Sequence, residues 1–195
     1  MTAYRNFTSD FPSRCLEILD AQTPWAKFRG RDVTLLLMVA STAFLIPFER
    51  IRPERNHPSG DNARFAELSS RLEKLLAEKF CGSTFCPEKH SSWQFAKGVP
   101  CVDGDLDGWF PPKSLKSISQ DKVVSSMLAL IRNALAHGNI FSSGSPIDRL
   151  IFVQKRDANS TFEVLSVSPS DFGDFVRGWV KFLSDSNMPE LYLVA

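Results

Sequence analysis

The stretch that decides the fold lies at residues 123–138, VVSSMLALIRNALAHG. Its apolar residues recur at spacings of three and four, which is typical of an amphipathic helix with one buried face. They are Val123, Val124, Met127, Leu128, Leu130, Ile131 and Leu135. Ser117 followed by Gln120 resembles a capping box, and Gly138 suits the left-handed residue that ends a helix. We therefore predict a helix from about 118 to 137.

Helical patterns also precede this stretch. A short helix is expected at 9–21 and an amphipathic helix at 61–80. Between them, residues 32–51 are strongly apolar, but their one long apolar run, Val33–Ile46, spans 14 residues, whereas a bilayer needs about 20. We predict that 32–51 is the central buried helix and that the protein has no membrane partner.

After the quoted stretch, residues 147–154 and 161–167 are rich in β-formers and predict a hairpin. Ser168 and Pro169 predict the start of a last helix at 169–184. Residues 81–116 lose all periodicity and predict a long irregular excursion. The expected fold class is all-α: one domain over 1–195, a helical bundle with a small β-hairpin inserted before its last helix.

Composition excludes several functional classes. Hydrophobic residues make up 43% of the 195, which is ordinary for a globular chain. With 23 Lys and Arg against 22 Asp and Glu, the chain has no strong basic field, so any contact with RNA must be local. The N-terminal residues do not resemble a signal peptide, and the four cysteines are expected to be reduced thiols. We expect a cytoplasmic protein.

Three polar side chains interrupt the apolar helix: Arg132, Asn133 and His137. At about 100° per residue, Arg132 lies about 140° from His137 and must reach around the helix to meet it. Histidine can transfer protons near neutral pH, and arginine can stabilise a pentavalent phosphorane, so the set suits metal-free cleavage of RNA. The alternative is structural: Arg132 pairs with a carboxylate, Asn133 bonds backbone groups and His137 caps the helix.

The run Arg132-Asn133-Ala134-Leu135-Ala136-His137 resembles the arginine, polar residue, three residues, histidine motif of the HEPN superfamily (higher eukaryotes and prokaryotes nucleotide-binding). The form RNALAHGN is similar to a bacterial branch, and the resemblance covers residues 120–184 in detail. It implies a metal-independent endoribonuclease that acts as a homodimer, with the motifs of two subunits in one composite cleft. Arg132 and His137 would be catalytic, with Asn133 in support. The ribose 2′-hydroxyl would attack the phosphate and leave a 2′,3′-cyclic phosphate.

The resemblance also implies a biological role and an alternative to it. The role is a toxin or antiphage-defence effector whose substrate is RNA and whose partner is an antitoxin or a sensor protein. Some such toxins carry a tyrosine two residues after the motif histidine, where an antitoxin attaches nucleotides; Asn139 stands there and departs from that pattern. Other HEPN domains bind RNA or nucleotide without cutting and regulate a partner, and the motif leaves this alternative open.

Two further residues are candidates for the same site. Glu49 and Arg50 could line the cleft, with the acid orienting Arg132 or His137, or they could form a solvated helix end. The apolar residues Met127, Ile131 and Leu135 are expected to face a second subunit.

Two other groups of residues carry weaker signals. No metal site or cofactor is predicted, because Cys81, Cys86, His90 and Cys101 lack a tight Cys-x-x-Cys pair and the acidic run at 103–107 lacks the features of a calcium loop. Aromatic residues of the excursion could stack on RNA bases, although anchoring the loop to the core is favoured. They are Trp93, Phe95, Trp109 and Phe110.

Overall fold

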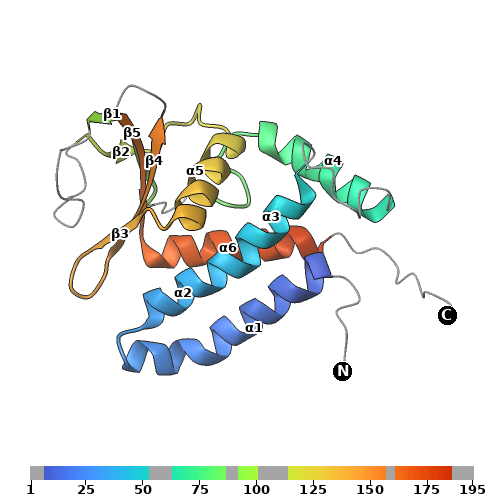
Figure 1. Cartoon of the computed structure of the whole chain (residues 1–195), viewed down its shortest axis with the longest axis horizontal. Coiled ribbons are helices and arrows are strands. Elements are labelled where there is room, and N and C mark those ends of the chain that lie inside the picture. The colour runs from blue at the N-terminus through green and yellow to red at the C-terminus, as the bar shows by residue number, and fades with distance from the viewer. Residues whose placement is uncertain (1–6, 53–62, 87–91, 101–113, 157–160, 186–195) are drawn as a thin grey trace.

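Figure 1 shows a layer of helices beside a single sheet, in a computed structural model that describes residues 7–52, 63–86, 92–100, 114–156 and 161–185. The helical elements are α1 (Phe7–Phe28), α2 (Asp32–Ala40), the π-helical η1 (Ser41–Leu45), α3 (Ile46–Ile51), α4 (Ala63–Ala77), α5 (Val124–His137) and α6 (Pro169–Ser184). The strands are β1 (Gln94–Pro100), β2 (Lys116–Ser117), β3 (Ile140–Ser143), β4 (Arg149–Arg156) and β5 (Thr161–Val167). The predicted helices are present and the fold is mostly helical, but the β element is a five-stranded sheet rather than the one small hairpin that we predicted.

The sheet has five antiparallel strands in the order β2-β1-β5-β4-β3. The predicted hairpin is its β4–β5 pair, with Leu150 opposite Val167. The segment 81–116 is not wholly irregular, because it contains β1, which pairs with β5. A register shift between Lys97 and Val99 breaks the alternation of β1, and Gly98 there has φ of 71°. A bulge of this kind hides the period of two on which strand prediction depends.

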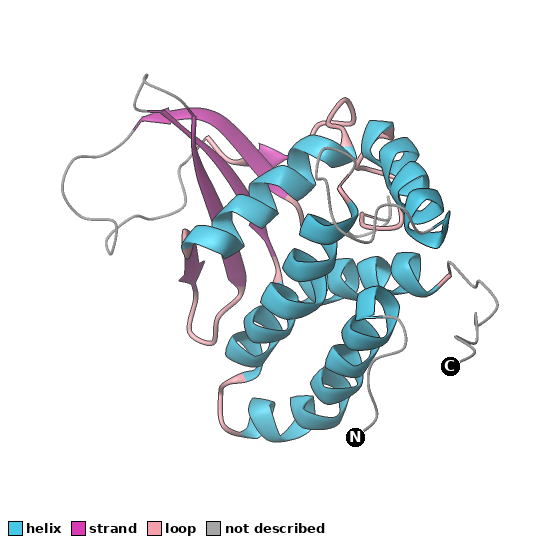
Figure 2. Ribbon diagram, turned by 45° about the vertical axis from the view of Figure 1, so that its right-hand side comes forward, coloured by secondary structure: helices cyan, strands magenta, loops and turns pink. Residues whose placement is uncertain are grey.

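The helices cover one face of the sheet (Figure 2). Leu150, Phe152, Leu165 and Val167 are fully buried on that face and join the main core with side chains of α5 and α6. The other face has a smaller buried cluster of its own, formed by Ala96, Val99, Ile151, Val153 and Val164. The sheet thus forms a layer that backs α5, the helix that carries the Arg132 and His137 motif.

The apolar segment 32–51 is one continuous helical run through α2, η1 and α3. By length and composition it could cross a membrane, but the core helix of a soluble protein passes the same test. Here Ala40, Ala43, Phe44 and Ile51 are fully buried within the protein. The run therefore has the central position that its sequence predicted.

Pro47 explains why this run contains a π-helical turn. Proline has no N–H and cannot donate to the carbonyl four residues back, which is that of Ala43. The indole Nε1 of the buried Trp179 donates to that carbonyl at 3.1 Å. The acceptor left open by Pro47 is thereby satisfied by α6, and the central helix is bonded to the last one.

Two of the three predicted helix caps are present in the structure. Ser168 Oγ accepts from the N–H of Asp171 at 3.1 Å, and Gly138 has φ of 69°, so both of these caps are confirmed. The capping box of Ser117 and Gln120 is wrong, because Ser117 belongs to β2 and α5 begins at Val124 without a side-chain cap. Instead, the N–H of Val124 donates to the carbonyl of Glu78 at 2.9 Å, just beyond α4. A tertiary contact replaces the local signal.

Candidate active site on helices α3 and α5

Helix α5 places its apolar and polar residues on different sides. Met127, Ile131 and Leu135 are only 1%, 0% and 9% exposed, so they belong to the core of a single chain and cannot be the dimer surface that we expected of them. Arg132 and Asn133 are half-buried, and His137 is exposed in the last turn. The three polar residues of the motif therefore lie on the side of α5 that faces away from the core.

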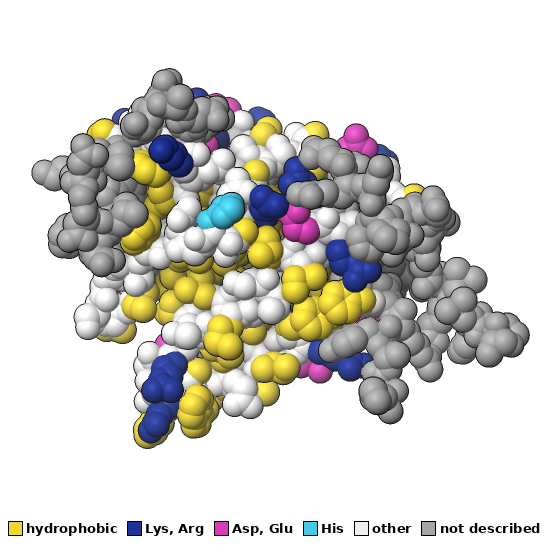
Figure 3. Space-filling model, in the orientation of Figure 1, with side chains coloured by type: hydrophobic (Ala, Val, Ile, Leu, Met, Phe, Trp, Pro, Cys, Tyr) yellow, Lys and Arg dark blue, Asp and Glu magenta, His cyan; other side chains and the backbone are white. Residues whose placement is uncertain are grey.

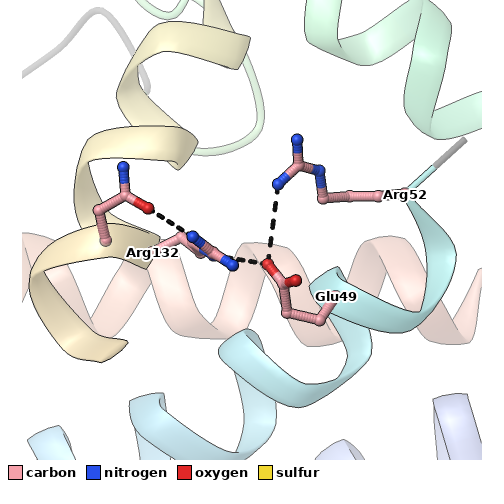
Figure 4. A network of polar contacts seen from close by, with 4 residues as sticks. Glu49, Arg52 and Arg132 are labelled. Atoms are coloured by element: carbon pink, nitrogen blue, oxygen red, sulfur yellow. Dashed lines mark hydrogen bonds and ion pairs between the residues drawn. The ribbon is translucent and has the colours of Figure 1, made fainter. Parts of the chain in front are cut away.

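Arg132 is held by two acceptors (Figure 4). Its Nε donates to Glu49 Oε1 at 2.5 Å, and its Nη1 donates to Asn133 Oδ1 at 2.6 Å. The side chains of Arg132 and Glu49 are 22% and 26% exposed, so the pair is partly shielded from water. Charge-assisted bonds of this kind fix the plane of a guanidinium group. The structure brings Glu49 to Arg132, one of the two partners predicted for it, and Asn133 bonds the arginine rather than the backbone.

A second guanidinium group lies on the same carboxylate oxygen. Arg52 Nη1 is 3.8 Å from Glu49 Oε1, and the Arg52 guanidinium lies over the ring of Phe48, 5.7 Å from its centre. Arg52 was not predicted from the sequence, although its spacing of three from Glu49 is a recognised signal for a helical ion pair. With two arginines and one carboxylate, this trio keeps one net positive charge at the surface.

Arg50 does not join this group. Its guanidinium lies over the ring of Phe7 in α1, 5.0 Å from the ring centre, and its Nε is buried without a hydrogen-bond partner. Glu49 and Arg50 are neighbours in sequence, but a helix turns their side chains about 100° apart. The structure thus separates the two residues that the sequence placed together in the cleft.

His137 is fixed through the backbone that follows it. The N–H of Asn139 donates to Ala134 O at 2.9 Å, and the Asn139 carbonyl accepts from Val153 of β4 at 3.0 Å. Within the described part of the chain, no hydrogen bond or ion pair joins His137 to Arg132. Arg132 does not reach around the helix, because Glu49 holds it on the α3 side. Figure 3 shows histidine, basic and acidic side chains on one face, beside hydrophobic ones.

The weaker candidates lie apart from this site. Trp93 is 2% exposed and packs edge-on against Phe80, with ring centres 5.2 Å apart, so it anchors β1 to the core. Phe95 is half-buried under Lys122. Among the residues that the structure describes, no three His, Cys, Asp or Glu gather closely enough to hold a metal ion. The remaining candidates, His90, Cys101, Asp103, Asp105, Asp107, Trp109 and Phe110, lie outside the described residues.

A mostly helical domain that carries a half-buried arginine and an exposed histidine on one helix fits the HEPN class, which contains nucleotide-binding and ribonuclease-like modules. The chain belongs to the family described as HEPN pEK499 p136, whose model matches residues 1–190. No curated protein and no solved structure matches the chain significantly. Membership in the HEPN superfamily, which we predicted from residues 120–184, is confirmed by a match that covers residues 1–190.

Proposed function

We propose that this protein is a metal-independent endoribonuclease. The observation that carries the proposal is the fixed guanidinium of Arg132, bonded by Glu49 and Asn133 about one and a half turns before the exposed His137 on the same helix. In the reaction, the bond between the 2′-oxygen and phosphorus forms while the bond from phosphorus to the 5′-oxygen breaks. The 2′-hydroxyl proton leaves to a base, and the departing 5′-oxygen takes up a proton. The products are a 2′,3′-cyclic phosphate and a 5′-hydroxyl.

Each residue has a separate task in this proposal. Glu49 and Asn133 accept from Nε and Nη1, which leaves the N–H groups of Nη2 to bond the oxygens of the phosphorane, where negative charge develops. His137 transfers a proton to or from the sugar oxygens. Glu49 and Asn133 are positioning residues, because they act through Arg132. DNA lacks the 2′-hydroxyl and is not a substrate.

The two catalytic groups belong to one cleft only if two chains combine, because a single chain holds Arg132 toward α3 and His137 away from it. A homodimer would bring the motif of each chain to the other and complete the site. Two side chains on the helical run that carries Glu49 support such a surface: Met38 and Ile46 are 64% and 39% exposed. Exposed apolar side chains next to polar ones are typical of subunit interfaces.

The role proposed with this activity is that of a conditional toxin or antiphage-defence effector in the cytoplasm, restrained by an antitoxin or released by a sensor protein. Such restraint is expected because unrestrained cleavage of RNA would harm the cell that makes the enzyme. Membership in a HEPN family is consistent with the role, and Asn139 at the position of the modified tyrosine argues for restraint by binding rather than by nucleotide transfer.

The experiment is incubation of the purified protein with total RNA in EDTA, followed by mapping of the fragment ends. We expect cleavage that persists in EDTA, cyclic phosphate ends, and no cutting of DNA of the same sequence. Cleavage that requires a divalent metal, or ends with a 5′-phosphate, would exclude this mechanism. RNA that is bound and left intact would favour the non-catalytic HEPN module that regulates a partner.

A further inference from the structure

We propose that the turn between α1 and α2 is a second binding site, which takes unpaired nucleic acid. The site consists of two aromatic and three basic side chains, and we call it the basic–aromatic turn: Trp25, Lys27, Phe28, Arg29 and Arg31. It lies on other elements than the Arg132 site, and its binding does not depend on cleavage. If the proposed function holds, the nucleic acid would be the RNA substrate.

The two aromatic rings are unusual in this protein because they face water. Phe28 is 85% exposed, the highest value among the large hydrophobic side chains of the described residues, and Trp25 is 56% exposed. Every other phenylalanine or tryptophan whose side chain is described is buried or half-buried. Exposed aromatic rings gathered at one place are typical of a binding surface rather than of a solvated helix end.

The exposure of the rings does not come from an irregular helix end. The N–H of Gly30 donates to Lys27 O at 3.0 Å, and the N–H of Arg31 donates to Ala26 O at 2.7 Å. With Gly30 at φ of 63°, these two bonds form a complete Schellman cap. Ala26 is 2% exposed and fixes the turn to the core. The cap therefore presents the rings of Trp25 and Phe28 on an ordered backbone.

Three basic side chains lie next to these rings in the sequence. Lys27, Arg29 and Arg31 are all exposed, and the Arg29 guanidinium lies 5.9 Å from the centre of the Trp25 ring. Asp32 is the only acidic residue between 25 and 32. Because the whole chain has a net charge of only +1, this is a local concentration of positive charge. Figure 3 shows basic and hydrophobic side chains together at the lower left, on the same face as the histidine.

The chemistry of this surface fits single-stranded nucleic acid. Unpaired bases have free faces that stack on aromatic rings, and phosphates between them pair with Lys and Arg. A groove of about 390 Å³ adjoins the turn, and its lining includes Lys27 of the turn, Thr23 of α1, Asp32 of α2, and Ser170, Asp174 and Arg177 of α6. It shares Lys27 with the turn and offers room for a ribose or a base next to that cation.

A membrane fits this surface less well. A helix that lies on a bilayer needs an apolar face along its length. The exposed residues of α1 before the turn include Glu17, Asp20 and Gln22, so the apolar surface there is interrupted by charge. Two rings beside three cations suit the alternation of bases and phosphates better than they suit a lipid surface.

The test measures binding of labelled oligonucleotides of about 12 residues by fluorescence anisotropy, in EDTA and in a His137→Ala background so that nothing is cut. The variants are Trp25→Ala with Phe28→Ala, and Lys27→Gln with Arg29→Gln and Arg31→Gln. The control is Lys74→Gln with Lys79→Gln and Lys181→Gln, which removes the same three charges from exposed positions elsewhere. Circular dichroism verifies that every variant is folded.

We expect the Kd for single-stranded RNA, and for single-stranded DNA of the same sequence, to rise about tenfold or more in both turn variants and to change less than about twofold in the control. The aromatic pair should not affect binding of duplex RNA, whose bases are already stacked. The basic triple variant should also reduce the slope of log Kd against log salt by about two.

Equal affinities for turn variants and control would overturn the proposal, as would loss of duplex binding together with single-strand binding in the aromatic pair. Cosedimentation with vesicles of phosphatidylcholine and phosphatidylglycerol that depends on the turn, without an effect on RNA, would assign the surface to membranes. A change in oligomeric mass alone would assign it to a second copy. If wild-type protein fails to cut RNA while the turn still controls binding, the nuclease proposal fails and this one stands.

Discussion

Arg132 Nε lies 2.5 Å from Glu49 Oε1, although the two residues are 83 positions apart in the sequence. The bond joins the end of the central helical run to the motif helix. It fixes the arginine on the α3 side of α5 and leaves His137 about 140° around the helix. This one contact decides how the motif can work, because the two catalytic candidates of a single chain face different directions.

The first prediction concerns Glu49→Gln, which keeps the shape of the side chain and removes its charge. We expect kcat for RNA cleavage to fall about tenfold or more, because the guanidinium loses the partner that orients it. KM should stay level or fall, since a negative charge near the phosphates has been removed. The free energy of unfolding should change by less than about 1 kcal/mol, because the pair is partly solvated.

The matched control for this variant is Glu73→Gln, the same change on the exposed face of α4. Its kinetics should equal those of the wild type. If Glu49→Gln lowers the melting temperature strongly and leaves kcat intact, Glu49 is structural and has no positioning role.

The second prediction concerns Gly138, which has φ of 69° directly after His137. Among the described residues other than its two chain neighbours, none has a heavy atom within 4 Å of the position that a Cβ would take, so the cost of substitution is that of the left-handed backbone. We expect Gly138→Ala to lower the free energy of unfolding by about 1 kcal/mol and Gly138→Asn to lower it less. Urea denaturation measures both, and equal stability of the two variants would contradict this account of the helix end.

The sequence predicts the elements whose signals are local. The caps at Ser168 and Gly138 and the apolar run 32–51 all depend on residues next to one another, and each appears as predicted. Strand β1 was not predicted because a bulge at Gly98 breaks its alternation. The start of α5 was misplaced because the first N–H of the helix donates to the carbonyl of Glu78. Both failures come from tertiary contacts that override a local pattern.

The residues of the site also divide into those that the sequence predicts and those that only the tertiary structure brings together. Arg132, Asn133 and His137 could be found because they share one helix, and their spacing alone defines the motif. Glu49 was only a candidate and Arg52 was missed, since their relation to Arg132 exists only when α3 packs beside α5. The dimer surface was misassigned for a related reason: periodicity shows that Met127 and Ile131 will be buried, but it does not say whether the same chain buries them.

The third prediction tests the bond between α6 and the central helix. Trp179→Phe removes the indole donor of a fully buried side chain and leaves the Ala43 carbonyl without its partner. We expect a loss of about 2–4 kcal/mol in the free energy of unfolding, from the lost bond and the cavity together. Trp25→Phe, at a site 56% exposed, is the control and should stay within about 0.5 kcal/mol of the wild type. Similar losses in both variants would show that the buried bond contributes nothing.

The fourth prediction separates binding from chemistry at Arg132 and His137. Each alanine variant should lose cleavage by about a hundredfold or more and keep its fold, since neither side chain fills the core. Arg132→Lys should recover RNA binding more than cleavage, because a point charge attracts phosphate but lacks the planar fork. The measurements are single-turnover cleavage and anisotropy with the same RNA. Wild-type rates in both alanine variants would remove the nuclease assignment from this motif.

The fifth prediction addresses the composite cleft. Because Glu49 holds Arg132 away from His137 within one chain, catalysis by both groups requires a second copy, and the protein should have a dimeric mass at micromolar concentration. A mixed dimer of one Arg132→Ala chain and one His137→Ala chain still has one arginine and one histidine in a shared cleft. A homodimer of either variant lacks one of the two groups entirely. The mixed dimer, isolated through two different tags, should therefore cut RNA well above either parent homodimer.

Two differently tagged His137→Ala chains are the matched control and should stay inactive, because pairing them restores no histidine. If the mixed dimer is folded and dual-tagged but as inactive as its parents, the two groups do not cooperate across the interface. A strictly monomeric wild-type protein that cuts RNA would exclude the shared cleft altogether, since Arg132 and His137 would then have to act from one chain.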